Sequence, residues 1–475
     1  MKKRLTIFIA MVLAIYFFLI GGVYAATITA ASCSQANVQT AINSSNTGDI
    51  VSVPAGNCTW SGNLTIANTK KLTLMGAGMN STIISGGAFN LGQSGSRVTG
   101  FGFSGGIINA DGYNFRIDHC RLTFSTWTDG IAVMSRNINP PVIVTGLVDN
   151  NELNNMRVRI DGTNYMMVEG TMQNQLWITN LDIGGPSAVY IEDNICNTGS
   201  GGVNCVDGNY GGRYVFRYNT MNGLDTEAHS VMGDNRAERK WEIYGNIINN
   251  TGSNIYFPFR IRGGTGVVFY NSVIGNWSND GIALDNVRSY SAVGSGGQCN
   301  GTSLWDGNQD ATGYPCRDQI GRGGDAALWV NSPPAGYNQP LVPVYGWLNR
   351  TETNGNVPFM VINSSGNHIK ANRDYYDYTA SFNGTSGMGA GTLANRPATC
   401  TKEVGYWATD QSTTNLTGMV GAHPSTPLSG TLYKCTANNT WTAYYTPYTY
   451  PHPLQGGVIV PTPTPPAAPT NLRIL

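Results

Sequence analysis

Four segments of the chain share one pattern: Ala188-Val-Tyr-Ile-Glu-Asp-Asn194, Arg213-Tyr-Val-Phe-Arg-Tyr-Asn219, Lys240-Trp-Glu-Ile-Tyr-Gly-Asn246 and Thr265-Gly-Val-Val-Phe-Tyr-Asn271. Each is a short run of β-prone residues that ends on Asn, and the Asn residues are 25, 27 and 25 positions apart. A fixed period of this length is typical of stacked repeats, because one short strand cannot bury its apolar face alone. The loops between the runs show no helical periodicity. The pattern predicts an all-β chain that folds as a parallel β-helix.

The register of the repeats predicts which side chains face the core. The residue three positions before each Asn is apolar and is expected to point inward. The Asn residues themselves should align at a turn, where each side-chain amide can bond to the coils above and below. The expected inward stack is Ile191, Phe216, Ile243 and Val268, and the expected Asn stack is Asn194, Asn219, Asn246 and Asn271.

The pattern extends in both directions from the four repeats. Ser34 is a plausible N-cap, and Val38, Ala41 and Ile42 form an apolar helical face, so a helix near residues 34–43 is expected to cap the open end of the solenoid. We expect the β-helix with its cap over 26–290, with coils from about residue 50. A loop-rich, aromatic-rich extension over 291–455 should pack on the β-helix or continue it, and 456–475 is a Pro-rich linker or tail.

The N-terminus predicts export. Lys2-Lys3-Arg4 precedes an apolar run from Leu5 to Val23, and Val23-Tyr24-Ala25 fits a cleavage site, so residues 1–25 are interpreted as a bacterial-type signal peptide. The apolar run is long for such a segment, and an uncleaved anchor stays open as the alternative. The mature protein is expected to be secreted and to have no membrane contact after cleavage.

Nine cysteines fit an oxidising compartment. Proximity in the sequence suggests four disulfides and leaves Cys120 as a buried free thiol, because Cys120 occupies the Asn position of an earlier coil, Ile117-Asp-His-Cys120. The suggested pairs are Cys33–Cys58, Cys196–Cys205, Cys299–Cys316 and Cys400–Cys435.

Charge argues against a nucleic-acid partner. Only 12% of the residues are charged, with 28 basic and 28 acidic side chains. The cationic residues of the repeats are instead concentrated on the outward face and on the loops before the third and fourth repeats. These residues are Arg213, Arg217, His229, Arg236, Arg239, Lys240, Arg260 and Arg262, with Glu242 among them. Such a face could bind an acidic polysaccharide, because Arg binds carboxylates bidentately. A solvated charge ladder without function explains it equally well.

Three motifs resemble those of pectate lyases, within the pectin-lyase-like superfamily of right-handed β-helices. Phe115-Arg-Ile-Asp-His-Cys-Arg-Leu122 with Asp129-Gly130 resembles that family's W-I-D-H-C…D-G pattern. Phe259–Asn271 resembles its P-R-x-R-x-G…N-N segment, and Val215-Phe-Arg-Tyr-Asn219 with His229 resembles its V-T-x-S-Y-N…H segment. The resemblance covers about residues 97–275 and implies a right-handed β-helix that cleaves an acidic glycan by β-elimination.

The resemblance also departs from the family at functional positions. Phe257 stands where the family's catalytic Arg is expected, and the Lys that follows the His segment is absent. Chondroitin- and alginate-type lyases use Lys and Arg on an adjacent-coil face, which Lys240, Arg213 and His229 could imitate as catalytic residues. Lys240 would need its pKa lowered by the neighbouring Arg residues to act as a base. Partial counterparts of the family's calcium ligands are Asp118, Asp129 and Glu192, so calcium is the cofactor that the resemblance implies.

Two functions remain open at this point. One is a secreted polysaccharide lyase, and the other is a non-catalytic extracellular scaffold, adhesin or glycan-binding surface protein. A concave outward face with clustered Arg and His over residues 188–271 would favour the lyase. A flat face covered by the 370–455 segment would favour the scaffold.

Overall fold

The computed structural model describes residues 25–135, 142–163, 176–177, 179–197, 204–223, 225–229, 236–255, 257–289, 298–299, 316–324, 339–351, 359–363, 368–411 and 430–456. The predicted signal peptide, apart from Ala25, and the Pro-rich tail, apart from Gly456, lie outside these residues. Within the described part of the chain, no helix is long and apolar enough to cross a membrane.

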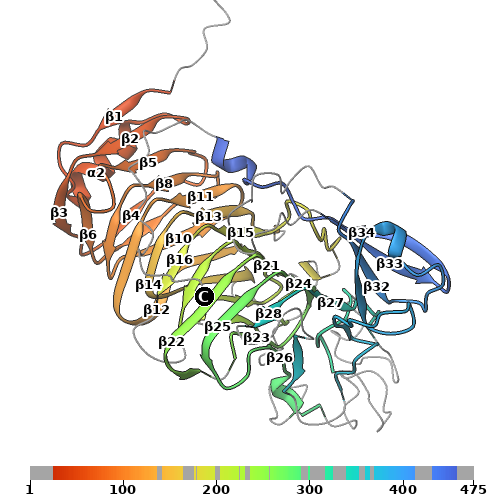
Figure 1. Ribbon diagram of the computed structural model, residues 1–475. Coiled ribbons are helices and arrows are strands. Elements are labelled where there is room, and N and C mark those ends of the chain that lie inside the picture. The colour runs from red at the N-terminus through yellow and green to blue at the C-terminus, as the bar shows by residue number, and fades with distance from the viewer. Residues whose placement is uncertain are drawn as a thin grey trace, which may run out of the picture.

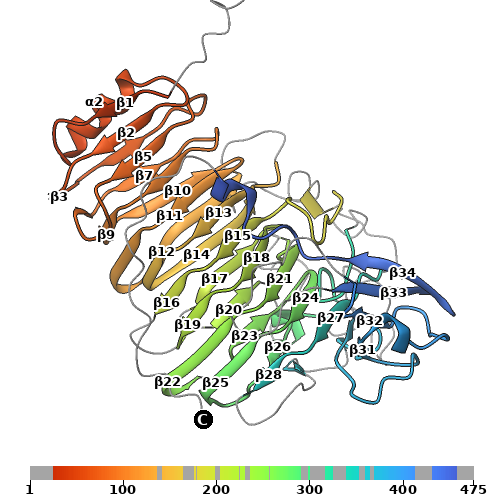
Figure 2. The ribbon, with the colours of Figure 1, turned by 45° about the horizontal axis from the view of Figure 1, so that its top comes forward.

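The chain is an all-β, right-handed parallel β-helix (Figures 1 and 2). Its strands form a 12-stranded sheet and an 18-stranded sheet. We call the first one sheet A. It contains, in spatial order, β1 (Thr27–Thr29), β2 (Ile50–Val53), β5 (Thr73–Gly76), β8 (Arg97–Thr99), β11 (Phe115–Asp118), β13 (Gly146–Asp149), β15 (Val189–Glu192), β18 (Arg213–Arg217), β21 (Lys240–Tyr244), β24 (Thr265–Phe269), β27 (Val344–Trp347) and β30 (Tyr375–Tyr376).

The 18-stranded sheet consists of two parallel ladders that share two long strands, β12 (Arg121–Ser135) and β14 (Glu152–Thr163). Ladder B uses their first halves together with β3 (Gly56–Thr59), β6 (Thr82–Ser85), β9 (Gly102–Ser104), β16 (Ile195–Asn197), β19 (Thr220–Asn222), β22 (Ile247–Ile255), β25 (Ser272–Trp277) and β28 (Arg350–Thr351). Ladder C uses their second halves together with β4 (Asn63–Thr65), β7 (Ala88–Asn90), β10 (Ile107–Asp111), β17 (Asn204–Asn209), β20 (Asp225–Ala228), β23 (Phe259–Ile261), β26 (Ile282–Leu284) and β29 (Met360–Ile362).

The predicted inward stack is confirmed. Ile191, Phe216, Ile243 and Val268 are register partners on β15, β18, β21 and β24, and all four are fully buried. The stack continues towards the N-terminus through Val148 and Ile117. Because each coil from β2 to β24 contributes one such residue, these coils share one continuous apolar core.

The predicted Asn stack is also confirmed, and it is longer than expected. Asn194 Nδ2 donates to Asn219 Oδ1 at 3.0 Å, and Asn219 Nδ2 donates to Asn246 Oδ1 at 3.2 Å. Asn246 and Asn271 repeat the bond, and the stack also includes Asn151 and Asn349. At its N-terminal end the stack reaches Cys120, whose backbone N–H donates to Asn151 Oδ1. The sequence position assigned to Cys120 was therefore correct.

The residue before each stacked Asn adopts the left-handed conformation. Asp193, Tyr218 and Tyr270 have φ of 58°, 59° and 53°, and Gly245 has 69°. This conformation costs a non-glycine residue about 1–3 kcal/mol. The Asn amides offset that cost, since each satisfies backbone groups of the coil below it as well as its neighbour in the stack.

The N-terminal cap and the disulfides agree with the sequence analysis. Helix α2 (Gln35–Ser44) has Ser34 as its N-cap, and its buried residues are Val38, Ala41 and Ile42. All four expected disulfides are present, namely Cys33–Cys58, Cys196–Cys205, Cys299–Cys316 and Cys400–Cys435. Cys120 is free and buried, and burial raises the pKa of its thiol.

The coils continue beyond residue 290, as in the alternative in which the 291–455 extension continues the β-helix. The segment between β26 and β27 is an insertion within one coil. After it, β27 and β30 continue sheet A, β28 continues ladder B and β29 continues ladder C, all in register. Asn271 Nδ2 donates to Asn349 Oδ1 at 2.9 Å, although the two residues are 78 positions apart. The repeat period is lost in the sequence because of this insertion, while the stacking itself continues.

The C-terminal region forms a separate small sheet and then returns along the solenoid. Strands β31 (Met388–Gly391), β32 (Gly405–Ala408), β33 (Thr431–Ala437) and β34 (Thr440–Tyr445) form a four-stranded sheet beside the last coils. Residues 446–456, which we call the strap, then run back over sheet A and end in the short 3-10 helix η4 (Pro453–Gly456) (blue in Figures 1 and 2). The strap lies on the outward face of sheet A and limits the access of a ligand to that face.

Candidate functional site

The outward face of sheet A, expected to be an Arg-rich groove, is covered by the strap. Arg217 is fully buried and donates from Nη1 to Tyr448 O at 2.8 Å and from Nη2 to Thr449 O at 2.9 Å. Its guanidinium also pairs with Glu192 at 2.5 Å. The carboxylate of Glu242 accepts the hydroxyl of Tyr445 at 3.0 Å.

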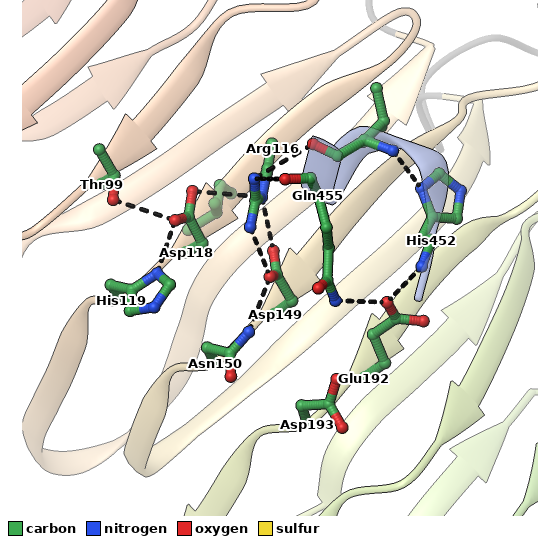
Figure 3. A network of polar contacts seen from close by, with 12 residues as sticks. Thr99, Arg116, Asp118, His119, Asp149, Asn150, Glu192, Asp193, His452 and Gln455 are labelled. Carbon is green, nitrogen blue, oxygen red and sulfur yellow. Dashed lines mark hydrogen bonds and ion pairs between the residues drawn. The ribbon is translucent and has the colours of Figure 1, made fainter. Parts of the chain in front are cut away.

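Figure 3 shows how the end of the strap is fixed on this face. The carboxylate of Glu192 accepts the backbone N–H of His452 at 3.1 Å and the amide of Gln455 at 2.8 Å. Arg116 donates to the carbonyl oxygens of Leu454 and Gln455, while it pairs with Asp149 at 2.8 Å. The buried charges of sheet A therefore bind the protein's own chain.

The strap's histidine is neutral. Burial, followed by the nearby cations Arg217 and Arg116, lowers the pKa of His452 to about 3. The backbone N–H of Leu454 donates to His452 Nδ1 at 3.2 Å, which requires that this nitrogen is unprotonated. The ring lies 4.7 Å from that of Tyr190 and so replaces solvent over sheet A.

Lys240 and Arg213, expected to be catalytic, lie within this covered region. Lys240 is fully buried, and its ammonium donates to Asp182 O at 2.7 Å and pairs with Glu242 at 3.3 Å. Arg213 donates to the carbonyl oxygens of Leu176 and Asn180 at 2.8 and 2.7 Å. Burial lowers the pKa of Lys240, with Arg213 as a smaller cause, and burial lowers the pKa of Arg213 to about 10. The pKa of Lys240 thus shifts in the expected direction, but the amine does not reach an open surface.

Arg236 and Arg239, expected to bind substrate, are also buried. Both guanidinium groups lie against the ring of Trp177, at 4.4 and 5.0 Å from its centroid. Arg236 pairs with Asp318 at 2.7 Å. Both arginines lie in the segment that connects β20 of ladder C to β21 of sheet A. The expectation of one open groove lined by Arg213, Arg217, Arg236, Arg239, Lys240 and Glu242 is therefore wrong.

The three residues suggested as calcium ligands do not form one site. Asp118 and Glu192 lie on sheet A, two coils apart, while Asp129 lies on ladder C. Asp118 pairs with Arg97, Arg116 and His119, and Glu192 pairs with Arg217. Their carboxylates are thus already neutralised by side chains of this chain.

One carboxyl group under the strap makes stability depend on pH. Burial and the neighbouring Glu192 raise the pKa of Asp193 to about 7, although the Tyr450 hydroxyl donates to both of its oxygens at 3.0 Å. A carboxyl group whose folded-state pKa is raised contributes stability fully below its unfolded pKa of about 3.9, and this contribution is lost as pH rises through 7.

We therefore expect Asp193→Asn to gain thermal stability relative to the wild type as pH rises. Thermal melts between about pH 4 and above pH 7 should show a Tm difference that grows in favour of the variant. Because the asparagine cannot ionise, this comparison isolates the contribution of the carboxyl group. A Tm difference that does not change with pH would contradict the assignment.

The outward face of ladder C carries a second group of charged residues, and this group is partly exposed. Apolar and polar residues alternate on its strands, as β-strand geometry requires of a face that meets solvent. Two rows of outward side chains cross the coils. The first is Arg159, Asp207, Glu227 and Arg260, which are direct register partners. The second, two positions further along each strand, contains Asp161, Asn209, His229, Arg262 and Asp285.

His229 is at the centre of this face. Its Nε2 lies 3.0 Å from Asp207 Oδ1, 3.5 Å from Glu227 Oε2 and 3.2 Å from Arg262 Nη2. Glu227 pairs with Arg262 and lies 3.6 Å from Arg260, and it accepts the amide of Asn204 at 2.7 Å. The side chains of His229, Arg262 and Arg260 are 17%, 12% and 39% exposed, so these three of the expected site residues can reach a ligand.

Asp207 is ionised at neutral pH and holds His229 in place. Burial would raise its pKa, but the hydrogen bond from His229 and the charges of His229, Arg157 and Arg262 outweigh burial, so that the pKa lies below its usual value. The Nε2 atom of His229 lies 3.0 Å from Asp207 Oδ1, so this carboxylate fixes the position of the ring. The pair has the arrangement of a base with an orienting carboxylate.

The neighbouring coils continue the charged face. Arg157 pairs with Asp129 and with Asp207, and Arg159 pairs with Asp129 and Asp161. Burial raises the pKa of Asp161 to about 6 in spite of Arg159, so this carboxyl is close to half-protonated in mildly acidic solution. Asp207 and Asp161 are thus two carboxyl groups on one face with pKa values shifted in opposite directions.

Sequence reasoning missed Arg157, Arg159, Asp161, Asp207 and Glu227. A signal was present in Arg157-Val-Arg-Ile-Asp161, Thr226-Glu-Ala-His229 and Phe259-Arg-Ile-Arg262, each of which alternates apolar and charged residues. The runs are only four or five residues long and lie outside the repeat that ends on Asn. Their common register is visible only once the coils are stacked.

Within the described residues, two groups bring three potential metal-ligating atoms within 4.8 Å of one another. One is Asp207, Glu227 and His229. The other is Cys299, Cys316 and His368, where both sulfurs are already joined in a disulfide. The carboxylates of the first group pair with Arg157 and Arg262, so a cation would compete with these guanidinium groups.

Comparisons with known proteins give distant structural similarity only. No protein-family model matches the chain, and no curated protein matches its sequence. An alginate lyase from Paenibacillus sp. str. FPU-7 is 14% identical with a TM-score of 0.26, covering 55% of this chain and 91% of the lyase. A PL6 family polysaccharide lyase from Pseudopedobacter saltans is 14% identical with a TM-score of 0.28, covering 72% and 77%. The catalytic domain of a GH87 alpha-1,3-glucanase is 11% identical with a TM-score of 0.28, covering 75% and 68%. Function is therefore argued from the site itself.

Proposed function

We propose that this protein cleaves an acidic polysaccharide by β-elimination on the outward face of ladder C, with His229 as the base. The observation that carries the proposal is the convergence of His229, Arg260 and Arg262, from neighbouring coils, on a partly exposed face. The buried carboxylate of Asp207 lies 3.0 Å from His229 Nε2 and positions the ring. The covered face of sheet A offers no comparable access.

The arginines would bind the carboxylate of a uronate residue. Guanidinium groups bind carboxylates bidentately. Of Arg260 and Arg262, Arg260 has the more exposed side chain. Neutralising the carboxylate makes the proton on the adjacent carbon more acidic, and fixed cations stabilise the enolate-like charge as it develops. Arg260 and Arg262, two residues apart on the same coil, thus provide the electrostatic part of catalysis.

His229 would take the proton and Asp207 would stabilise the resulting imidazolium. As C5–H is broken, its electron pair forms a C4–C5 double bond, the C4–O glycosidic bond breaks, and the leaving oxygen takes a proton from water. The ionised Asp207 at 3.0 Å keeps the ring oriented. This replaces Lys240, whose amine is buried and bound to the backbone of Asp182, as the base.

Calcium remains part of the proposal. Asp207 and Glu227 supply the carboxylate oxygens that calcium prefers, and a bound cation could neutralise the uronate alongside Arg260. Asp118 and Glu192 lie on sheet A and not on this face, so they are not part of this site. Adding a chelator to the assay tests this requirement separately from the role of His229.

A non-catalytic scaffold is the second candidate, and one observation favours it. The face of the coils over residues 188–271 is covered by the strap, as expected of a scaffold rather than of an open groove on that side. In that case the charged face of ladder C would bind an acidic glycan without cleaving it. Binding with no product distinguishes this alternative from the lyase.

The test is incubation of the purified protein with polygalacturonate, alginate and chondroitin, each with calcium or with chelator. β-Elimination creates a conjugated double bond, so product is followed by its ultraviolet absorbance. We expect at least one acidic glycan to give unsaturated product. Binding of an acidic glycan with no such product from any of the three would reject the lyase in favour of the scaffold.

A further inference from the structure

An exposed tryptophan stands beside the charged face of ladder C. Trp127 lies on β12, two residues before Asp129, and its relative exposure is 44%. Large apolar side chains in the described part of the chain are seldom so exposed, the others being Tyr113, Ile195, Leu341 and Ile362. A single exposed ring is not unusual in itself, so its position and orientation have to carry the argument.

One face of the Trp127 ring is covered by a guanidinium group. The Cζ atom of Arg157 lies 4.3 Å from the ring centroid, a cation–π geometry. Arg157 is itself held by ion pairs to Asp129 and Asp207. Because both of these carboxylates belong to the charged face, the ring is fixed on one side and directed to solvent on the other.

Arg157 also connects the ring to the proposed catalytic pair. Its guanidinium contacts both the ring of Trp127 and the carboxylate of Asp207, which in turn lies 3.0 Å from His229. The ring is therefore separated from the base by one guanidinium and one carboxylate. That separation places the ring beside the unit to be cleaved and not over it.

We propose that Trp127 is a stacking platform for a pyranose ring of the acidic glycan, in a subsite next to the cleavage position. This inference rests on the proposed function and adds a specificity-determining residue to it. The C–H face of a sugar packs on an aromatic ring through dispersion and apolar burial, while the charged rows bind its carboxylates. A glycan long enough to reach both Trp127 and His229 is bound more tightly than a short one.

The experiment compares Trp127→Ala and Trp127→Phe with Tyr113→Ala as a matched control, since Tyr113 is equally exposed at 45% and outside the charged face. Trp127→Ala is expected to raise KM for the polymer roughly five- to tenfold, with kcat within about twofold, from the usual energies of aromatic contacts. Trp127→Phe should recover most of the loss, and Tyr113→Ala should match the wild type. Short oligosaccharides that cannot span the face should show little difference between the variants.

A purely structural role for Trp127 predicts a different pattern. If the ring only supports Arg157 and Asp207, Trp127→Ala lowers kcat and shifts the pH profile instead of raising KM, and the platform is rejected. An unchanged KM for the polymer rejects it as well.

Binding measured by affinity electrophoresis separates this inference from the proposed cleavage. If the wild type binds an acidic glycan without cleaving it, weaker binding by Trp127→Ala supports the platform while the lyase reaction fails. If Trp127→Ala binds as the wild type does, the platform fails whether or not the lyase reaction stands. If the wild type binds none of the three glycans, both proposals are overturned.

Discussion

Replacing Arg217 by alanine is expected to destabilise the folded protein by about 3–5 kcal/mol, because the change leaves a buried carboxylate without its cation. Arg217 and Glu192 are both fully buried and 2.5 Å apart. The guanidinium also donates to Tyr448 O and Thr449 O of the strap and lies 4.6 Å from the ring centroid of Tyr190. Its loss therefore weakens both the core of sheet A and the docking of the strap.

Urea denaturation measures this effect, with Arg121→Ala as the control. Arg121 pairs with Glu152 at 2.7 Å, but these side chains are 35% and 28% exposed, so its loss should cost less than about 1 kcal/mol. Combining Arg217→Met with Glu192→Gln should recover part of the loss, since no buried charge is then left unpaired. Equal midpoints for Arg217→Ala and Arg121→Ala would show that the strap does not bury this pair in solution.

The sequence was sufficient for the features that repeat locally. One apolar residue and one Asn per coil determine the inward stack and the Asn stack, and both were predicted with the right residues. The position of Cys120 in that stack followed from the same period. The N-cap of α2 and the disulfide pairs depend on contacts close in the sequence or on adjacent coils, and they were predicted correctly for that reason.

The exposure of each outward face could not be predicted from the same information. Arg217 contacts Tyr448, 231 positions later, and no periodicity in the repeats indicates that a distant segment covers them. A face that is open to solvent and a face that is covered by a distant segment would therefore show the same pattern in the local sequence. Ladder C was missed as a site because its rows contain one or two polar residues per coil, separated by loops of unequal length. Only His229, Arg260, Arg262 and Asp129 were recognised there.

Replacing His229 by asparagine is expected to lower kcat/KM on the cleaved glycan by about 10²–10⁴, the usual contribution of general base catalysis. Asparagine keeps a polar group near Asp207 but cannot accept the proton. The variant should fold as the wild type does, because the His229 side chain is 17% exposed and lies outside the core. Binding of the glycan should be retained, since Arg260 and Arg262 are unchanged.

The most direct measurement is the rate of unsaturated-product formation by His229→Asn compared with Lys240→Met, each normalised to folded protein. These two residues represent the two faces: His229 is partly exposed on ladder C, whereas Lys240 is buried on sheet A. The methionine fills the volume of the buried lysine, but it leaves the buried carboxylate of Glu242 without its cation, so the rate has to be normalised to the folded fraction. We predict that His229→Asn loses activity by at least about a hundredfold and that Lys240→Met keeps the wild-type rate. Full activity in His229→Asn together with loss of activity in folded Lys240→Met would place the reaction on sheet A and contradict this account.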